Sequence, residues 1–303
     1  MERPARDRAS AEKGRCIMGN PVLKLGGLTM QGRKRFGPDE ESLLEECRQQ
    51  ETVNEIYRLL AQRRNIARAQ RLRWMARQFL LPLRERGEVP VVVVSAFDWA
   101  TDKLEQFAAA MSSDPAPREY ARLLMSGELR ANAALAIVLE DMGCRARSMT
   151  GREAGLITTG GPVGAQVESV NQAHLVDLVE MQIVPVVAGF QGYYYDRETG
   201  RDEVSILGRG GSNLTAVALA AALEEPEATM LTDVDGLYDS DPRHHPQAQK
   251  LESIRASELL TWEPFPQVIQ KEAVQYAVRM GVNIWIRSGD QPDLPGSLIV
   301  CRE

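Results

Sequence analysis

A glycine-rich turn that carries one arginine precedes an Ala- and Leu-rich stretch in the segment Ile206–Leu223. Gly208, Gly210 and Gly211 lack a Cβ, so the backbone can approach a ligand closely and can adopt positive φ. The free N–H groups at the start of a following helix favour an anion. Arg209 adds a planar guanidinium that can hold a carboxylate or a phosphate through two hydrogen bonds. The segment therefore indicates an anion site, although a helix that merely follows a flexible loop would look the same.

Short apolar runs rich in Val and Ile alternate with amphipathic stretches, which predicts an α/β fold. Near-continuous apolar runs such as Val91–Val94 are typical of strands covered on both faces, so we expect a mainly parallel central sheet sandwiched between helices. We expect strands at Pro21–Leu25, Val89–Ser95, Arg145–Thr150, Ile183–Ala188, Ala228–Thr232, Asn283–Arg287 and Ser297–Cys301. We expect helices at Gly37–Glu85 in pieces, Thr101–Met111, Pro117–Met142, Gln172–Met181, Asn213–Glu224 and Pro266–Met280, and a β-hairpin tip within Tyr193–Ser205.

Composition narrows the class of protein. The chain has 303 residues, of which 44% are apolar, so it can bury one large core or two modest ones. A net charge of −6 argues against a general nucleic-acid binder. The four cysteines form no Cys-x-x-Cys pair, the three histidines show no metal-ligand spacing, and no apolar run approaches the ~20 residues that span a bilayer. We expect a cytoplasmic protein without protein-held metal and without a membrane or nucleic-acid partner.

The segment Thr52–Arg77 has apolar residues at helical spacing and many arginines. These arginines are Arg58, Arg63, Arg64, Arg68, Arg71 and Arg77. We expect them to lie against the chain's own carboxylates, because the chain is acidic. Docking of a partner protein is the second interpretation, and nucleic-acid binding is the third.

Seven blocks in order resemble the aspartate kinase branch of the amino-acid kinases, and together they cover roughly residues 20 to 300. They are Val22–Gly27, Val91–Asp102, Leu124–Glu128, Ser148–Gly155, Val186–Gly192, the Gly208 turn and Thr232–Arg243. Nearly every block begins where a predicted strand ends, which is where open α/β sheets place their ligands. The chain lacks Gly-x-x-x-x-Gly-Lys-Ser/Thr and a full Gly-x-Gly-x-x-Gly, so a P-loop or a dinucleotide fold is not supported.

The resemblance implies transfer of the γ-phosphoryl group of ATP, accompanied by Mg²⁺, to the side-chain carboxylate of L-aspartate, giving 4-phospho-L-aspartate. Catalysis would then rest on positioning and electrostatic stabilisation. Lys24 matches the family's catalytic lysine, and Asn213 lies where the family has an aspartate that orients this lysine. The implied substrate-binding residues are Thr101, Glu128, Arg209, Gly210 and Ser212.

The implied ATP-binding residues begin with Gly26 and Gly27, whose amides we expect to face the phosphates. The remaining ones are Thr232, Asp233, Tyr238, Asp241, Arg243 and Gln267. Considered without the resemblance, Glu128 is typical of a helix start, Thr101 of an N-cap, and Asp233 of a turn.

The sequence departs from the family pattern at charged positions. Asn213 replaces an aspartate, and Gln267 lies where many relatives have an ATP-contacting lysine. The segment Phe97–Ala100 replaces a Gly-Lys-Thr type loop, and Leu28 lies where a hydroxyl residue is usual. Neutral groups form weaker hydrogen bonds than charged ones. The site has therefore either been retuned or weakened, and two alternatives stay open: a kinase for another amino-acid or carboxylate acceptor, and a catalytically weak pseudokinase that binds nucleotide.

The resemblance also implies a domain organisation. We expect an N-terminal extension at 1–19 and one amino-acid kinase domain at 20–303 with an enlarged helical insertion at 37–88. The amino-acid-binding lobe would span 20–205 and the nucleotide-binding lobe 206–303. Relatives continue into regulatory ACT domains where this sequence stops at Glu303, so we expect no feedback inhibition in cis. We also expect a homo-oligomer, with the 52–77 helix as a candidate surface for a partner protein.

Overall fold

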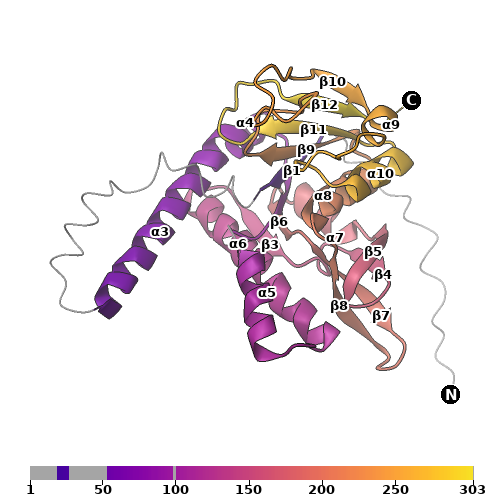
Figure 1. Cartoon of the computed structure of the whole chain (residues 1–303). Helices are drawn as coiled ribbons and strands as arrows, with labels where there is room; N and C mark the ends of the chain where they lie inside the picture. Colours follow the sequence, from indigo (N-terminus) through magenta and orange to yellow (C-terminus); the bar gives the residue numbers. More distant parts are fainter. Residues whose placement is uncertain (1–18, 27–52, 98–99, 303) are drawn as a thin grey trace.

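Eight strands form one mainly parallel sheet in the computed structural model, which describes residues 19–26, 53–97 and 100–302, with side chains from residue 61 onward in the second range. The strand order is β10-β12-β11-β9-β1-β2-β6-β3, and only the β11–β12 pair is antiparallel (Figure 1). The bounds are β1 Val22–Leu25, β2 Val91–Val94, β3 Ala146–Met149, β6 Val184–Ala188, β9 Glu227–Thr232, β10 Ser253–Arg255, β11 Asn283–Ser288 and β12 Ser297–Val300. The predicted α/β class is confirmed.

The first strand lies in the middle of this sheet. Lys24 in β1 is in register with Val93 of β2 on one side and Met230 of β9 on the other. All four residues of β2 and all five of β6 are buried, as expected for parallel strands covered on both faces. The sheet therefore places a lysine between Val93 and Met230, two fully buried apolar residues of the neighbouring strands.

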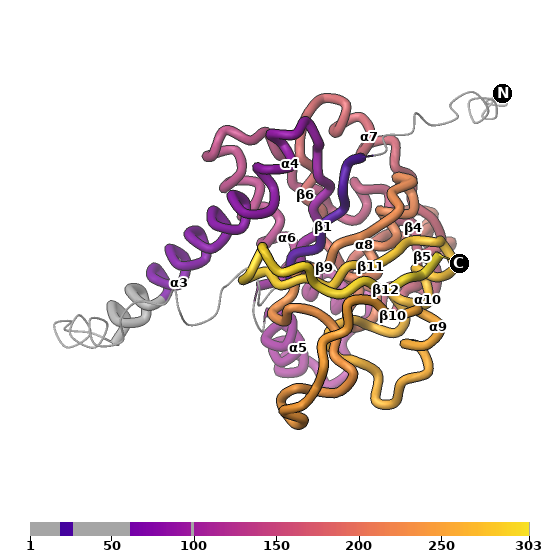
Figure 2. The backbone as a smooth tube through the Cα atoms, turned by 90° about the horizontal axis from the view of Figure 1, so that it is seen from above, coloured from indigo at the N-terminus to yellow at the C-terminus, as the bar shows by residue number. Residues whose placement is uncertain are grey.

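Helices pack against the strands of the sheet. Helix α8 (Gly211–Ala222) packs on β1, β2 and β9, and α10 (Lys271–Met280) packs on α8 and β11. Helix α6 (Pro117–Asp141) packs on β2, β3 and β6, with α5 (Ala100–Met111) against it. The tube view in Figure 2 shows α8 close to β1 and β9. Two further helices are α7 (Ala173–Glu180) and α9 (Ala256–Leu259).

A small closed barrel of four strands lies beside the main sheet (Figure 1). Its strands are β4 (Leu156–Thr159), β5 (Val163–Val170), β7 (Gln191–Asp196) and β8 (Arg201–Leu207). The predicted hairpin is confirmed, because β7 and β8 pair antiparallel across Arg197–Gly200. Strands β4 and β5 and the short β10 were not expected from the sequence. Most side chains of β5 are exposed, so it lacks the apolar run by which the other strands were found.

One long helical unit precedes β2. It comprises α3 (Val53–Met75), a π-helical turn η2 (Ala76–Leu80) and α4 (Leu81–Glu85), and α3 projects from the body in Figure 1. Arg71 of α3 is buried and donates hydrogen bonds to the Gly289 carbonyl (2.7 Å) and to Asp290 (2.5 Å). The expectation that arginines of this helix meet the chain's own carboxylates is confirmed for Arg71. The side chain of Arg58 lies outside the described residues.

Among the helices in the described ranges, we find none that combines the length and the apolar character needed to cross a membrane.

Candidate active site

The carboxyl ends of the central strands are joined by backbone hydrogen bonds into one edge. The Ser95 amide donates to the Leu25 carbonyl (3.2 Å), the Gly189 amide to the Val94 carbonyl (2.9 Å), and the Gly289 amide to the Thr232 carbonyl (2.8 Å). These bonds place the segments that follow β1, β2, β6, β9 and β11 side by side. Open α/β sheets bind ligands at such an edge.

Lys24 supplies a positive charge near this edge. Burial lowers the pKa of Lys24 to about 8, and the negative charge of Asp233 opposes that shift. Asp233 itself is exposed, directly after β9. The buried ammonium group of Lys24 can stabilise an anionic ligand. The exposed carboxylate of Asp233 can bind a cation that accompanies this ligand.

The expected phosphate contact from Gly26 needs a correction. The Gly26 amide donates to the Leu231 carbonyl at 3.1 Å, because the β1–β9 ladder continues one residue past β1. This N–H group is therefore not available to a phosphate in the structure. Gly27, the second glycine of the pair, lies outside the described residues.

The glycine-rich turn does begin helix α8, as predicted. Gly210 precedes the helix at φ +77°, a conformation that side chains with a Cβ rarely adopt. A Cβ at Gly210 would lie 1.7 Å from Cδ of Gln270, so the glycine also makes room for that side chain. The next residues, Ser212 and Asn213, are buried, and Gly189 at the end of β6 leaves space for Ser212. The start of α8 thus lies at the same sheet edge as the end of β6.

Asn213 has one satisfied and one open polar atom. Its Nδ2 donates to Oε1 of Gln270 at 2.6 Å. Its Oδ1 is buried, and no described residue or backbone group gives it a hydrogen bond. Gln267, the residue expected at the ATP site, is exposed in the turn three positions before Gln270. The sequence did not indicate Gln270 as a partner of Asn213.

Glu128 is a buried carboxylate on the inner face of α6. Its Oε1 accepts a hydrogen bond from the Ala96 amide at 3.2 Å, while its Oε2 has no partner among the described residues. Burial raises the pKa of Glu128 to about 7, although the hydrogen bond from Ala96 partly offsets this effect. Gly127 allows the close approach, because a Cβ there would lie 2.9 Å from Cβ of Ala96. An open buried carboxylate oxygen is a site for a cationic donor.

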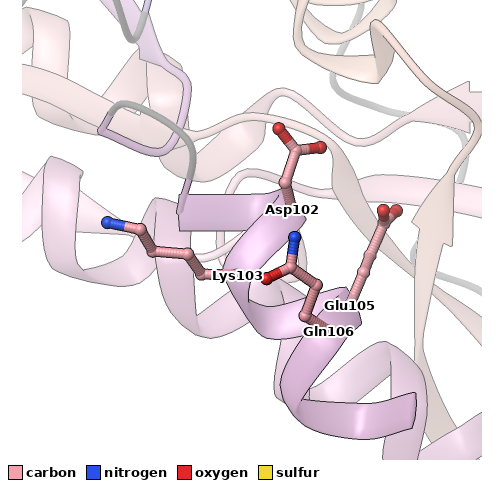
Figure 3. A pocket seen from close by; sticks show the side chains of 4 residues that line it. All are labelled: Asp102, Lys103, Glu105 and Gln106. Carbon is pink, nitrogen blue, oxygen red and sulfur yellow. The ribbon is translucent and has the colours of Figure 1, made fainter.

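Arg209 points out of the turn towards helix α5. Its side chain is 84% exposed, and its Nη2 lies 3.3 Å from Glu105 and 4.0 Å from Asp102. Figure 3 shows that Asp102 and Glu105 extend to the same side of α5, while Lys103 extends elsewhere. These three residues and Gln106 line a cavity of about 410 Å³. Thr101, in the first turn of α5, is partly buried.

The remaining nucleotide candidates follow β9 and mostly contact one another. The Thr232 hydroxyl accepts from the Val234 amide at 3.1 Å, and the Tyr238 hydroxyl donates to Asp235 at 3.0 Å. Arg243 donates to both carboxylate oxygens of Asp241, which lowers the pKa of Asp241 to about 2. The Asp241 hydrogen bond raises the pKa of Arg243, and the charge of Asp233 also contributes. The loop therefore lies near the carboxyl end of β9.

Protein side chains alone do not form a metal site in the described part of the chain, where no group of three or more His, Cys, Asp or Glu side chains comes together. Mg²⁺ commonly binds through one or two carboxylates and the phosphates of its nucleotide. Asp233 is placed to supply one such carboxylate, so the donor set fits a metal that arrives with a nucleotide.

Comparison with known proteins gives a consistent family. A model described as the amino acid kinase family matches residues 22–288. The aspartokinase of Mycolicibacterium smegmatis is 39% identical over 236 residues, which is 78% of this chain and 55% of the relative. The aspartokinase of Corynebacterium glutamicum is 39% identical over 232 residues, which is 76% of this chain and 54% of the relative. The chain therefore spans about half the length of the curated relatives that it matches.

Solved structures agree. The aspartate kinase from Synechocystis superposes with a TM-score of 0.68 at 29% identity, covering 93% of this chain and 40% of that one. The E. coli aspartokinase III in complex with aspartate and ADP has a TM-score of 0.64 at 20% identity, covering 94% of this chain and 65% of that one, and it supports the fold alone.

Proposed function

The chain belongs to the amino acid kinase family, and on that premise we propose that it transfers the γ-phosphoryl group of ATP to the side-chain carboxylate of L-aspartate. The similarity to aspartokinases supports aspartate as the acceptor. The products are 4-phospho-L-aspartate and ADP. A bond forms between a side-chain oxygen of aspartate and Pγ, and the bond from Pγ to the β–γ bridging oxygen breaks. The acceptor is already ionised at neutral pH, so the step requires no general base.

Glu128 carries this proposal. Its Oε2 is buried without a hydrogen bond from the described residues, and an ionised carboxylate in that position needs a positively charged partner. The α-ammonium group of an amino acid supplies that charge with three N–H donors. Arg209 then holds a carboxylate of the same molecule, and Thr101, Gly210 and Ser212 complete the amino-acid site.

Lys24 acts on the phosphoryl group. Negative charge spreads over the transferring group, and a fixed cation at the end of β1 stabilises it without reorganising during the reaction. Oδ1 of Asn213 is an open acceptor that can take a hydrogen bond from Lys24. Without the Gly26 amide, which is bonded to Leu231, the proposed ATP site keeps Gly27, Thr232, Asp233, Tyr238, Asp241, Arg243 and Gln267.

Mg²⁺ would be held by the phosphates of ATP and by Asp233, and it would supply positive charge to the β- and γ-phosphoryl oxygens. Asp233 also keeps Lys24 charged, because its negative charge raises the lysine pKa against the effect of burial. Arg243 lies near Asp233, and we expect it to contact the nucleotide phosphates.

A hydroxamate assay tests the reaction directly. Hydroxylamine traps an acyl phosphate, so the full chain is incubated with Mg-ATP and each member of a panel of amino acids. We expect a signal with L-aspartate that requires ATP. A signal only with another amino acid would assign a different acceptor and disprove the aspartate proposal.

The Asn213–Gln270 pair favours a second candidate, a nucleotide-binding protein with little turnover. Both side chains are neutral and one hydrogen bond of 2.6 Å joins them, so neither supplies the full charge that would orient a catalytic lysine. Binding of ATP in calorimetry without any hydroxamate product would support this candidate.

We also propose the division into an amino-acid-binding lobe at 20–205 and a nucleotide-binding lobe at 206–303. A cytoplasmic location and a homo-oligomer stay predictions, and size-exclusion chromatography with light scattering measures the latter.

A further inference from the structure

The proposed substrate arginine already has a carboxylate partner within the chain. Nη2 of Arg209 lies 3.3 Å from Oε2 of Glu105, and the next carboxylate, Asp102, is 4.0 Å away. Glu105 and Arg209 come from segments 104 residues apart, so the contact depends on the fold. Both carboxylates extend to the same side of α5, as Figure 3 shows.

Packing fixes the rotation of α5 that presents Glu105. The adjacent residue, Leu104, packs on the buried cluster formed by α6 and β8, which includes Leu124. A Cβ on Gly127 of α6 would be 3.5 Å from Leu104, so the two helices approach closely there. Burial and the negative charge of Glu105 raise the pKa of Tyr120 on α6, and the positive charge of Arg209 partly offsets that rise. The phenol of Tyr120 therefore lies close enough to the pair to interact with both charges.

The contact uses the nitrogen that a bound carboxylate needs. A guanidinium has two edges that can hold a carboxylate with two hydrogen bonds, Nε with Nη2 and Nη1 with Nη2. Nη2 carries two N–H groups, one on each edge, so Glu105 at Nη2 occupies one edge and its negative charge lies next to the other. Glu105 therefore competes directly with a ligand carboxylate at the edge that it occupies, and it repels one at the other edge.

We propose that Glu105 is a specificity-determining residue that acts as an internal competitor for the substrate carboxylate on Arg209. The inference rests on the proposed function, because it takes Arg209 as the substrate-binding group. A ligand displaces Glu105 only when its carboxylate and its ammonium group bind together, the ammonium at Glu128. A ligand that has a carboxylate but no ammonium group gains only the contact with Arg209, and it must still displace Glu105. The cavity of about 410 Å³ beside Glu105 gives the displaced side chain room to move.

The expected effect is modest, because the pair is exposed. Side chains of Arg209 and Glu105 are 84% and 32% exposed, and exposed ion pairs contribute little. We expect Glu105→Gln to lower the KM for aspartate about two- to fivefold, where fivefold is about 1 kcal/mol at 1.4 kcal/mol per tenfold. The KM for ATP and kcat should stay within about twofold of wild type.

The experiment measures KM for aspartate and for ATP in the full chain. Glu105→Asp keeps the charge and should stay close to wild type, while Asp102→Asn should act in the same direction as Glu105→Gln but more weakly. Glu119→Gln is the matched control, since Glu119 is an exposed glutamate on α6 that does not contact Arg209. In an Arg209→Ala background, Glu105→Gln should no longer change the KM for aspartate.

The outcomes separate this inference from the proposed function. If wild type yields no product with aspartate, the proposed function and this inference both fail. If wild type is active but Glu105→Gln leaves the KM for aspartate unchanged or raises it, the competitor role alone is disproved. The same holds if the effect of Glu105→Gln persists in the Arg209→Ala background. Succinate, which lacks the ammonium group, should inhibit Glu105→Gln more strongly than wild type.

Discussion

Replacing Glu128 by glutamine should stabilise the fold at alkaline pH and weaken amino-acid binding. Burial raises the pKa of Glu128 from 4.5 to about 7, so the folded state favours the protonated carboxyl. The stability that this group contributes is fully present below about pH 4.5 and is lost as the pH rises through about 7. The difference of about 2.5 pKa units corresponds to about 3 kcal/mol, at about 1.36 kcal/mol per unit.

Glutamine removes the ionisation and keeps the shape. It retains an oxygen that can accept from the Ala96 amide, but its amide nitrogen would lie where Oε2 has no partner. That unpaired amide costs about 1–3 kcal/mol at every pH. The informative quantity is therefore how the stability difference between variant and wild type changes with pH. It should favour Glu128→Gln by about 2–3 kcal/mol more at pH 8 than at pH 5.

Urea unfolding of both proteins between pH 5 and pH 8 measures this change. Glu119→Gln, an exposed substitution on the same helix, should show no comparable trend. Calorimetry should show weaker aspartate binding to Glu128→Gln with ATP binding retained. A stability difference that is constant with pH would refute the reasoning, because it would mean that Glu128 is not desolvated in the fold.

Three other predictions follow from the site and its supports. The kcat/KM for aspartate should rise through about pH 7, where Glu128 loses its proton, and fall above about pH 8, where Lys24 loses its proton. Lys24→Arg should remove the alkaline fall from the pH–rate profile. Gln270→Ala should lower stability by about 1–3 kcal/mol in urea unfolding, because it leaves the buried Asn213 amide without an acceptor. Arg71→Met should lower the free energy of unfolding by somewhat less than the ~3–5 kcal/mol lost when a fully buried ion pair is broken, because the remaining Asp290 carboxylate is 23% exposed. A thermal midpoint equal to that of wild type would contradict this expectation.

The sheet could be predicted from the sequence because its strands are short apolar runs such as Val91–Val94. Strand β5 could not, since most of its side chains are exposed and it has no comparable apolar run, and the short β4 (Leu156–Thr159) ends in two threonines. Among the candidate site residues, Glu128 and Arg209 were identified by family resemblance, and their burial and partners required the fold.

Gln270 and Glu105 illustrate what a sequence pattern omits. Each meets a site residue from a segment at least 57 positions away, and neither has a residue type or spacing that indicates this contact. The Gly26 amide was misjudged for a related reason. Its hydrogen bond to Leu231 depends on how far the β1–β9 ladder continues, which a local glycine pair does not determine.

The attachment of α3 through Arg71 divides that helix into two regions of different local stability. In the stretch 61–70 no side chain is buried, whereas Arg71, Leu72 and Met75 are buried against the body. Most of the stability of a helix in a protein comes from tertiary packing of its buried face. The outer turns of α3 can therefore fray while the clamped end stays folded, so opening of this helix proceeds inward and stops at residue 71. Amide exchange along α3 would record that boundary as a step rather than as a gradual slope.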